Sequence, residues 1–329
     1  MGRLSSLILG ISLLLLPGTQ FAGEAGAADR YPVKPVNFVV PLEAGSDGDI
    51  LARPLCQKIS TAIGQPVMIV NKPGGGSAIG VREVYASKPD GYTIGMSAIT
   101  LVTNKLQGIL PYDHHDFTPL GIFYMFNHVI IASNKTSRPF KTIQEVIDFA
   151  RKNPGEVKLA TAGVGQSLWI AAHAFIDGTG ISVNAIPQTG AGGSTVLQAA
   201  GGHVDIAVVG VGAAKAQLEA GNVRLIAVIG TKRALPPYDN VPTLKEVGYD
   251  INWETFGILI GPPKMSKEAT DKLSKAVEEA ATDPEYAKFL TGVSAYPFYL
   301  PPDKVNKFLD ERQEIARKIM DKTGILKKN

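Results

Sequence analysis

PLEAGSDGD, residues 41–49, is the stretch that decides the fold of this chain. An apolar run ending at Val40 precedes it, and apolar residues at helical spacing from Ile50 to Ile63 follow it. A strand that ends in a loop of small residues and opens a helix leaves several backbone N–H groups unpaired. Those donors and the positive end of the helix dipole make an anion site without a basic side chain. The stretch therefore predicts an α/β fold with an anion-binding loop after its first strand.

Strand-like and helix-like patterns alternate along the rest of the chain. This βαβαβ order implies parallel strands joined by right-handed crossovers. The first series predicts strands at 37–40, 67–70 and 92–96, with helices at 49–63 and 78–86. The second series begins near His128 and predicts strands at 129–132, 157–160, 183–186, 205–209 and 224–228, with helices at 142–152, 167–175, 193–200 and 213–220. A strand at 256–260 and helices at 267–281, 284–290 and 302–320 close the chain.

The length and the order of these elements predict two lobes. Of the 329 residues, about 300 belong to the expected mature part, which exceeds one ordinary hydrophobic core. The chain leaves the first sheet near 121–127 and returns near 230–254. We therefore expect one lobe from 29–123 plus 254–329 and a second from 124–253. The two crossings between them form a natural hinge.

The first 28 residues have the layout of a cleavable signal peptide. Arg3 is followed by the apolar run 7–16, a Pro17-Gly18 break and small residues that permit cleavage after Ala27 or Ala28. The run is too short for a membrane span, and with no nearby cysteine we expect no lipid anchor. The mature protein is therefore expected to be exported to the periplasm.

Composition excludes several other classes. The single cysteine, Cys56, permits neither an internal disulfide nor a thiolate metal site. A net charge of +3 does not favour nucleic-acid binding. The predicted loops at the carboxyl ends of the strands, where open α/β sheets bind ligands, are rich in Gly, Ser and Thr and hold one lysine and no arginine. They favour a carboxylate over a polyphosphate; they are 42–46, 71–77, 97–100, 161–167, 188–190 and 210.

A set of short motifs in a fixed order resembles one family along almost the whole mature chain. The motifs are Tyr31-Pro32, Lys34-Pro35, residues 41–49, Ala52-Arg53, Gly64-Gln65-Pro66-Val67, Asn71-Lys72-Pro73-Gly74, Gly80, Pro89-Asp90-Gly91-Tyr92-Thr93, Gly201-Gly202-His203-Val204-Asp205, Gly221, Arg224-Leu225, Arg233, Val241-Pro242-Thr243, Phe256-Gly257 and Gly261-Pro262. They resemble the Bug-type solute receptors of tripartite tricarboxylate transporters.

The resemblance implies a type II periplasmic-binding-protein fold. We expect a monomeric receptor without enzymatic activity, cofactor or metal. It implies that a small organic carboxylate binds between the lobes and is handed to a membrane permease. Carried over by position, the ligand-binding residues are Ala44, Gly45, Ser46, Ser97, Thr161, Gly163 and Ser167. Four more residues of the same loops complete the candidate set, namely Glu43, Asp49, Gly165 and Gln188.

The chain departs from the family pattern at several loop positions. Gly45-Ser46 replaces two glycines, Glu43 and Asp47 stand where neutral residues are common, Trp169 stands where a histidine often occurs, and Gln188-Thr189 replaces a Tyr-Lys/Arg pair. A bound carboxylate facing Glu43 would be repelled. We therefore hypothesise that these changes adjust the site to the distal end of the ligand.

Several residues could be assigned a metal-binding or catalytic role, but a structural role explains each of them better. Asp49 is expected to cap a helix rather than bind a metal with Asp47. The run 114–116, His-His-Asp, is expected to be a solvated loop, because no third ligand is evident. Ser46 and Ser167 lie in no nucleophile elbow, and no histidine is placed to act as their base. Trp169 either lines the cleft or packs on its helix.

Two other functions remain open at this point. A receptor that feeds a sensor kinase would bind the same ligand, and an exported α/β hydrolase would need a nucleophile, a base and an acid in the cleft. Dicarboxylates, tricarboxylates, aromatic acids and acidic amino acids all suit the loops.

Overall fold

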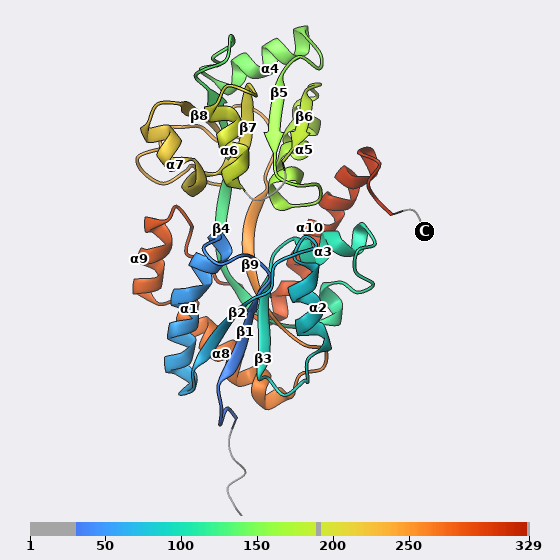
Figure 1. Ribbon diagram of the computed structural model, residues 1–329, viewed down its shortest axis with the longest axis vertical. Coiled ribbons are helices and arrows are strands. Elements are labelled where there is room, and N and C mark those ends of the chain that lie inside the picture. The colour runs from blue at the N-terminus through green and yellow to red at the C-terminus, as the bar shows by residue number, and fades with distance from the viewer. Residues whose placement is uncertain (1–30, 189–191, 328–329) are drawn as a thin grey trace, which may run out of the picture. The chain divides into compact units, whose positions relative to one another are not determined.

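A single long strand, β4 (Thr118–Ser133), connects two regions of β-sheet (Figure 1). The computed structural model describes residues 31–188 and 192–327, so the predicted signal peptide lies outside the described residues. The strand order is β2-β1-β3-β9-β4-β7-β5-β6, and β8 also pairs with β4. We call the strands before and including β9 in this order the first sheet region, and those beyond β4 the second sheet region.

The first sheet region carries the predicted βαβαβ unit. Its strands are β1 (Val36–Val40), β2 (Val67–Asn71), β3 (Thr93–Ser97) and β9 (Glu254–Gly261). β1 is parallel to both β2 and β3, which confirms the predicted parallel order, whereas β9 is antiparallel to β3.

The second sheet region repeats the alternation of strands and helices. Its strands are β5 (Lys158–Thr161), β6 (Asn184–Pro187), β7 (Ile206–Gly210) and β8 (Val223–Ile229). The expectation that a separate strand begins near His128 was wrong. β4 instead pairs with β9 up to Asn127 and with β7 and β8 from His128 onward, so one strand serves both regions.

The helices cover these strands largely where the sequence places them. Their bounds are α1 (Asp47–Ile63), α2 (Ala78–Ala86), α3 (Thr100–Leu106), η1 (His114–Asp116), α4 (Ile143–Lys152), α5 (Ser167–Thr179), α6 (Gly192–Ala200), α7 (Val211–Glu219), α8 (Lys267–Ala281), α9 (Pro284–Gly292) and α10 (Pro302–Lys322). The short α3 was not predicted, since its seven residues are too few to show a clear helical period. Among the described helices, none combines the length and apolar character needed to cross a bilayer.

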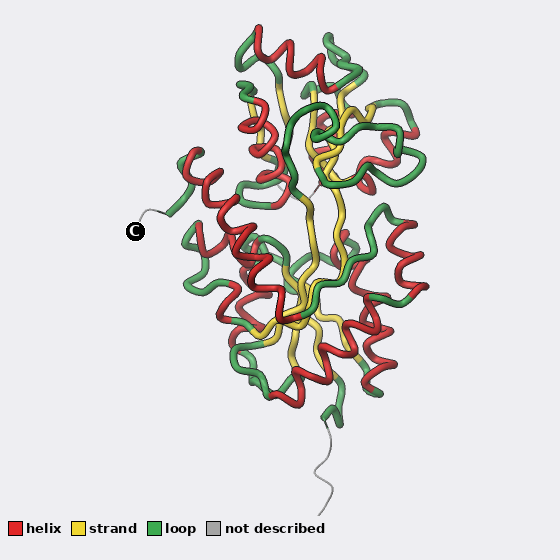
Figure 2. Tube along the Cα trace, turned by 180° about the vertical axis from the view of Figure 1, so that it is seen from behind, coloured by secondary structure: helices red, strands yellow, loops and turns green. Residues whose placement is uncertain are grey.

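The longest helix, α10, packs across both sheet regions rather than on the first alone (Figure 2). Its buried face contains Val305, Leu309, Ala316, Ile319 and Met320, which follow the helical period. It contacts β4 and α3, and it also contacts α5 of the second sheet region.

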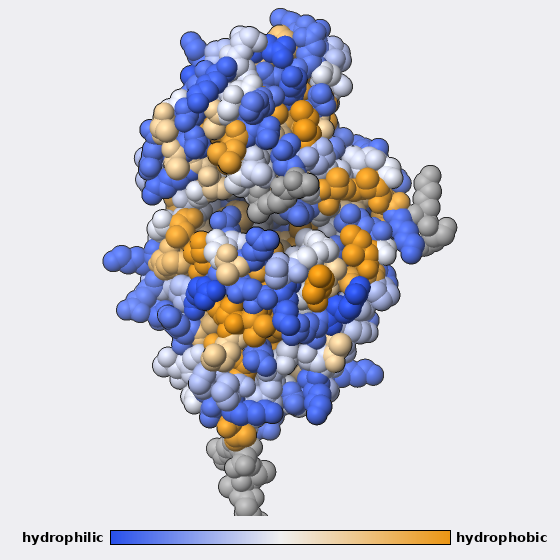
Figure 3. Space-filling view, in the orientation of Figure 1, coloured by the Kyte–Doolittle hydropathy of each residue, from blue (hydrophilic) through white to orange (hydrophobic). Residues whose placement is uncertain are grey.

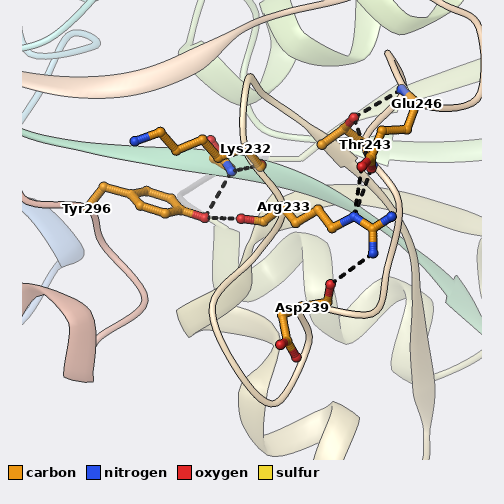
Figure 4. A network of polar contacts seen from close by, with 7 residues as sticks. Lys232, Arg233, Asp239, Thr243, Glu246 and Tyr296 are labelled. Carbon is orange, nitrogen blue, oxygen red and sulfur yellow. Dashed lines mark hydrogen bonds and ion pairs between the residues drawn. The ribbon is translucent and has the colours of Figure 1, made fainter.

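The return crossing at 230–254 is fixed to its surroundings by a polar network (Figure 4). Arg233 donates from Nε to both carboxylate oxygens of Glu246 at 2.9 Å. Asn127 of β4 donates to the Lys232 carbonyl at 2.5 Å and to the Tyr296 hydroxyl at 3.1 Å. Tyr296 in turn donates to the Arg233 carbonyl. Side-chain hydrogen bonds therefore hold this crossing in place. The predicted boundaries of the two lobes remain a prediction.

Candidate functional site

The loop after β1 is shaped by the first residues of α1. Gly45 has a φ of +82°, which favours glycine. Ser46 is the N-cap of α1, and its Oγ accepts a hydrogen bond from the Asp49 N–H at 3.4 Å. The Oδ2 of Asp49 accepts the Gly45 N–H at 2.8 Å. Ser46 and Asp49 therefore share the capping role that the sequence analysis assigned to Asp49 alone.

Asp49 holds the loop from inside rather than presenting a carboxylate to a ligand. Arg53 donates from Nε and Nη2 to its two oxygens at 2.9 Å, and Asn71 of β2 donates to Oδ1 at 3.0 Å. Burial alone would raise the pKa of Asp49, but the hydrogen bonds from Arg53, Gly45 and Asn71 outweigh burial and lower that pKa. The carboxylate is thus ionised and fully engaged, and its role is to fix the loop.

Some of the backbone amides that were predicted to bind an anion already donate hydrogen bonds within the protein. The N–H of Gly45 binds Asp49, and that of Ser46 binds the Glu43 carbonyl at 3.2 Å. The amides of Asp47 and Gly48 have no acceptor among the described residues and lie at the positive end of α1. These two amides are the donors that the start of the helix offers an anion.

A cavity of about 300 Å³ adjoins this end of α1. It lies between elements of both sheet regions, and the molecular surface is drawn inward between the parts built on those regions (Figure 3). Asp47 links it to the loop after β1, but none of the eleven predicted site residues lines it. Its lining comprises Asp47, Ile50, Leu51, Phe126, Gly210, Val211, Gly212, Lys215, Gly292, Val293, Ser294 and Ala295.

Two predicted residues, Ser97 and Thr161, hold buried hydroxyls without partners. Ser97 ends β3 with 1% exposure and Thr161 ends β5 with 0% exposure. Neither Oγ has a hydrogen-bond partner among the described residues. Leaving a buried hydroxyl unpaired costs about 1–3 kcal/mol, so a ligand oxygen that reaches it is favoured. The two hydroxyls belong to different sheet regions, as a ligand bound between them requires.

Ser167, at the start of α5, belongs to a polar chain that the sequence analysis missed. Trp253 donates from Nε1 to Ser167 Oγ at 3.1 Å, and Ser167 and Thr255 hydroxyls lie 2.8 Å apart. Thr255 Oγ1 lies 2.7 Å from His128 Nε2, and His128 Nδ1 lies 3.0 Å from the Trp253 carbonyl. The Trp253 carbonyl requires a proton on Nδ1, so Nε2 accepts from Thr255 and Thr255 accepts from Ser167.

The sequence analysis did not foresee this neighbour of Ser167: His128 Nε2 lies 3.4 Å from Ser167 Oγ. Burial lowers the pKa of His128 to about 4, while the hydrogen bond to the Trp253 carbonyl opposes that shift. The Ser167 proton is directed to Thr255, and Nε2 is occupied by the Thr255 hydroxyl. The group therefore ties α5 to β4 and β9 and does not form a nucleophile–base pair. The one sequence signal was a histidine inside the apolar run of β4.

The remaining candidates of the second sheet region, Gly163, Gly165 and Gln188, lie in closely packed loops. Gly165 has a φ of +80°, and a Cβ there would lie 2.2 Å from Gln107 Nε2, which brings the end of α3 against this loop. The backbone N–H of Gln188 donates to the Thr161 carbonyl at 2.8 Å, while its side chain donates to its neighbour Ile186. Gly163 packs near the Gln188 carbonyl. Thr189 and Gly190 lie outside the described residues.

Two departures from the family pattern, and the candidate Ala44, can also be placed. Glu43 and Ala44 are exposed on the loop after β1. Trp169 is buried with 3% exposure, and its ring centroid lies 4.1 Å from that of His173 on the same helix. Trp169 therefore packs on its helix and does not line a cleft.

Comparisons with known proteins agree with this architecture. A family model described as the tripartite tricarboxylate transporter family receptor matches residues 51–325. A Cupriavidus necator protein named for the gbd 5' region is 31% identical, over 91% of this chain and 90% of its own length. The periplasmic binding protein BugD shares the fold with a TM-score of 0.76 and 26% identity, over 91% of this chain and 100% of that one.

A second solved structure was determined with a bound dicarboxylate. The R. palustris protein Rpa4515 with adipate has a TM-score of 0.79 and 25% identity, covering 90% of this chain and 99% of that one. The fold described above is thus the fold of periplasmic solute-binding proteins.

Proposed function

Because the chain belongs to the tripartite tricarboxylate transporter family of receptors, we propose that it binds a small organic carboxylate in the periplasm and delivers it to a membrane permease. The observation that carries this proposal is the pair of buried, unpartnered hydroxyls of Ser97 and Thr161 at the ends of β3 and β5. A carboxylate offers acceptors to such donors, and the amides of Asp47 and Gly48 supply more at the end of α1.

The mechanism is capture between two lobes followed by closure. Ser97 belongs to the first sheet region and Thr161 to the second, so a ligand that contacts both favours the state in which the regions are close. β4 crosses between the regions, and the chain returns to the first region at the start of β9, so such a movement occurs about these two places. The closed, monomeric receptor would then dock on the permease.

A dicarboxylate is the ligand class that we favour. The relative Rpa4515 was solved with adipate. Two sets of hydroxyl or amide donors on opposite sides of the site suit a ligand with an acid group at each end. The candidate residues Glu43, Ala44, Gly45, Ser46, Asp49, Gly163, Gly165, Ser167 and Gln188 then shape the surrounding loops rather than all contact the ligand.

The hydrolase alternative is not favoured by the geometry around Ser167. Its hydroxyl donates into the chain that ends at His128, and no carboxylate takes part in that chain among the described residues. Delivery to a sensor kinase would use the same ligand and stays an alternative for the downstream partner.

A thermal-shift screen of the refolded chain against mono-, di- and tricarboxylates tests the proposal. Refolding removes any ligand captured during expression. A ligand present at 100 times its Kd adds about 2.7 kcal/mol to the free energy of unfolding. We expect dicarboxylates to raise the Tm and their neutral diesters to have no effect. A folded protein that responds to no carboxylate, or that hydrolyses the diesters, would contradict the proposal.

A further inference from the structure

Two histidines and one aspartate that lie far apart in the sequence converge on the surface near α10. His114 Nε2 and His115 Nε2 of η1 lie 3.1 Å and 2.8 Å from Asp310 Oδ1 of α10. Their potential ligand atoms all lie within 4.8 Å of one another. The expectation of a solvated loop was therefore wrong, because the third partner is supplied by a helix nearly 200 residues away.

The turn that carries the two histidines is held in place by its own hydrogen bonds. Asp113 Oδ1 accepts the His115 N–H at 3.0 Å, and Asp116 Oδ2 accepts the Asp113 N–H at 2.9 Å. The His114 side chain is buried, whereas His115 and Asp310 are 52% and 49% exposed. The group is thus fixed on one side and open to solvent on the other, so an ion can reach it.

We propose that His114, His115 and Asp310 form a binding site for a divalent transition-metal ion such as Zn²⁺. Imidazole nitrogens are good ligands for Zn²⁺, Ni²⁺ and Cu²⁺. Two histidines and one carboxylate fill three coordination positions and leave the others to water. Ligand atoms at the usual Zn²⁺ bond lengths of about 2.1 Å lie roughly 3.4 Å apart in a tetrahedral site. The observed separations of 2.8 Å and 3.1 Å need to open by roughly 0.3 to 0.6 Å, and the separation of the two imidazole nitrogens is at most 4.8 Å.

The surroundings also limit the affinity of this site. His114 would bind through Nε2 and carry its proton on Nδ1, which has no hydrogen-bond partner among the described residues. Metal-bound histidines usually donate that second N–H to an acceptor, and its absence weakens binding. We therefore expect micromolar rather than nanomolar affinity.

The bound ion would join η1 to α10. Because α10 also contacts β4 and α5, the site lies on the helix that spans the two sheet regions. The ion would stabilise the packing of this helix. The metal site is separate from the carboxylate site.

Calorimetric titration with Zn²⁺ tests the proposal, using the chain without an affinity tag after refolding in a chelator. The informative variants are Asp310→Asn and His115→Gln, whose exposed side chains make loss of the fold unexpected. His203→Gln, at another exposed histidine, is the matched control. We expect one Zn²⁺ per chain for the wild type and the control, at least tenfold weaker binding for each variant, and visible absorption bands of the Co²⁺-loaded wild type that both variants lose.

Equal Zn²⁺ affinity in the wild type and Asp310→Asn would overturn the site. So would wild-type binding that His203→Gln abolishes, since the ion would then bind elsewhere. A metal-induced rise in Tm that persists in His115→Gln would lead to the same conclusion.

Discussion

At the scale of single residues, the direction of each hydrogen bond decides what Ser167 can do. The chain from Trp253 through Ser167 and Thr255 to His128 returns to the Trp253 carbonyl, so each hydroxyl proton has one assigned acceptor. The sequence placed Ser167 at a helix start correctly. It could not show His128 and Thr255 beside it, because they lie 39 and 88 residues away and meet only through the pairing of β4 with β9.

Replacing Thr255 with Val should lower the free energy of unfolding by about 1–3 kcal/mol. The change removes the hydroxyl between Ser167 and His128 and leaves buried His128 Nε2 with only the longer contact of 3.4 Å to Ser167 Oγ. Chemical denaturation measures the loss. Thr61→Val, at an exposed helical threonine, is the matched control and should change stability by less than about 0.5 kcal/mol. Equal effects of the two substitutions would show that this series of hydrogen bonds does not stabilise the fold.

The buried His128 also predicts a loss of stability on acidification. Its pKa falls from 6.5 in the unfolded chain to about 4 in the folded protein because burial disfavours the charged ring. The unfolded state then binds more protons between these values, so stability decreases as the pH falls from about 6.5 to about 4. The decrease from this residue is about 3 kcal/mol.

Comparing the pH dependence of unfolding for the wild type and His128→Asn isolates this contribution, since the carboxyl groups cancel in the difference. The wild type should lose more stability across the interval by the stated amount. Identical slopes for the two proteins would show that His128 is already accessible to protons in the fold.

At the scale of elements, the start of α1 was the local structure that the sequence predicted best. Small residues between an apolar strand and a helical pattern dictate a capped turn, and Ser46 and Asp49 supply the caps. The sequence could not show that Asp49 is bound by Arg53 and by Asn71, because the latter lies on a neighbouring strand. The sequence also could not show which loop amides already donate hydrogen bonds within the protein.

Replacing Asp49 with Asn should destabilise the fold by about 1–3 kcal/mol and weaken ligand binding. The carboxylate holds the Gly45 amide, Arg53 and Asn71, and the amide side chain has one acceptor oxygen for the three of them. Denaturation and calorimetric titration measure the two effects. Asp271→Asn, at an exposed i,i+4 pair in α8, should leave both unchanged. Wild-type behaviour of Asp49→Asn would show that the loop does not depend on this residue.

At the scale of the whole molecule, the alternation of strands and helices predicted the α/β architecture, and the parallel pairing of β1 with β2 and β3 confirms it. The continuity of β4 was not predicted, because an apolar run does not reveal where a strand changes partners. The reach of α10 to α5 was also missed, since a helical period identifies a buried face but not what covers it.

Ligand binding should bring the two sheet regions closer. Small-angle scattering should show a smaller radius of gyration with a saturating carboxylate than without it. Hydrogen exchange should slow mainly in β4, in β9 and in the loops after β3 and β5. Unchanged scattering and exchange in the presence of a bound ligand would exclude closure as the mechanism.

The central claim is that the hydroxyls of Ser97 and Thr161 are reserved for a ligand carboxylate. The direct test is calorimetric titration of the wild type and of the double variant Ser97→Ala, Thr161→Val with the best dicarboxylate from the thermal-shift screen. Neither hydroxyl has a partner among the described residues, so the variant without ligand should be at least as stable as the wild type. Its affinity should fall at least about tenfold. An unchanged affinity at unchanged stability would contradict the account.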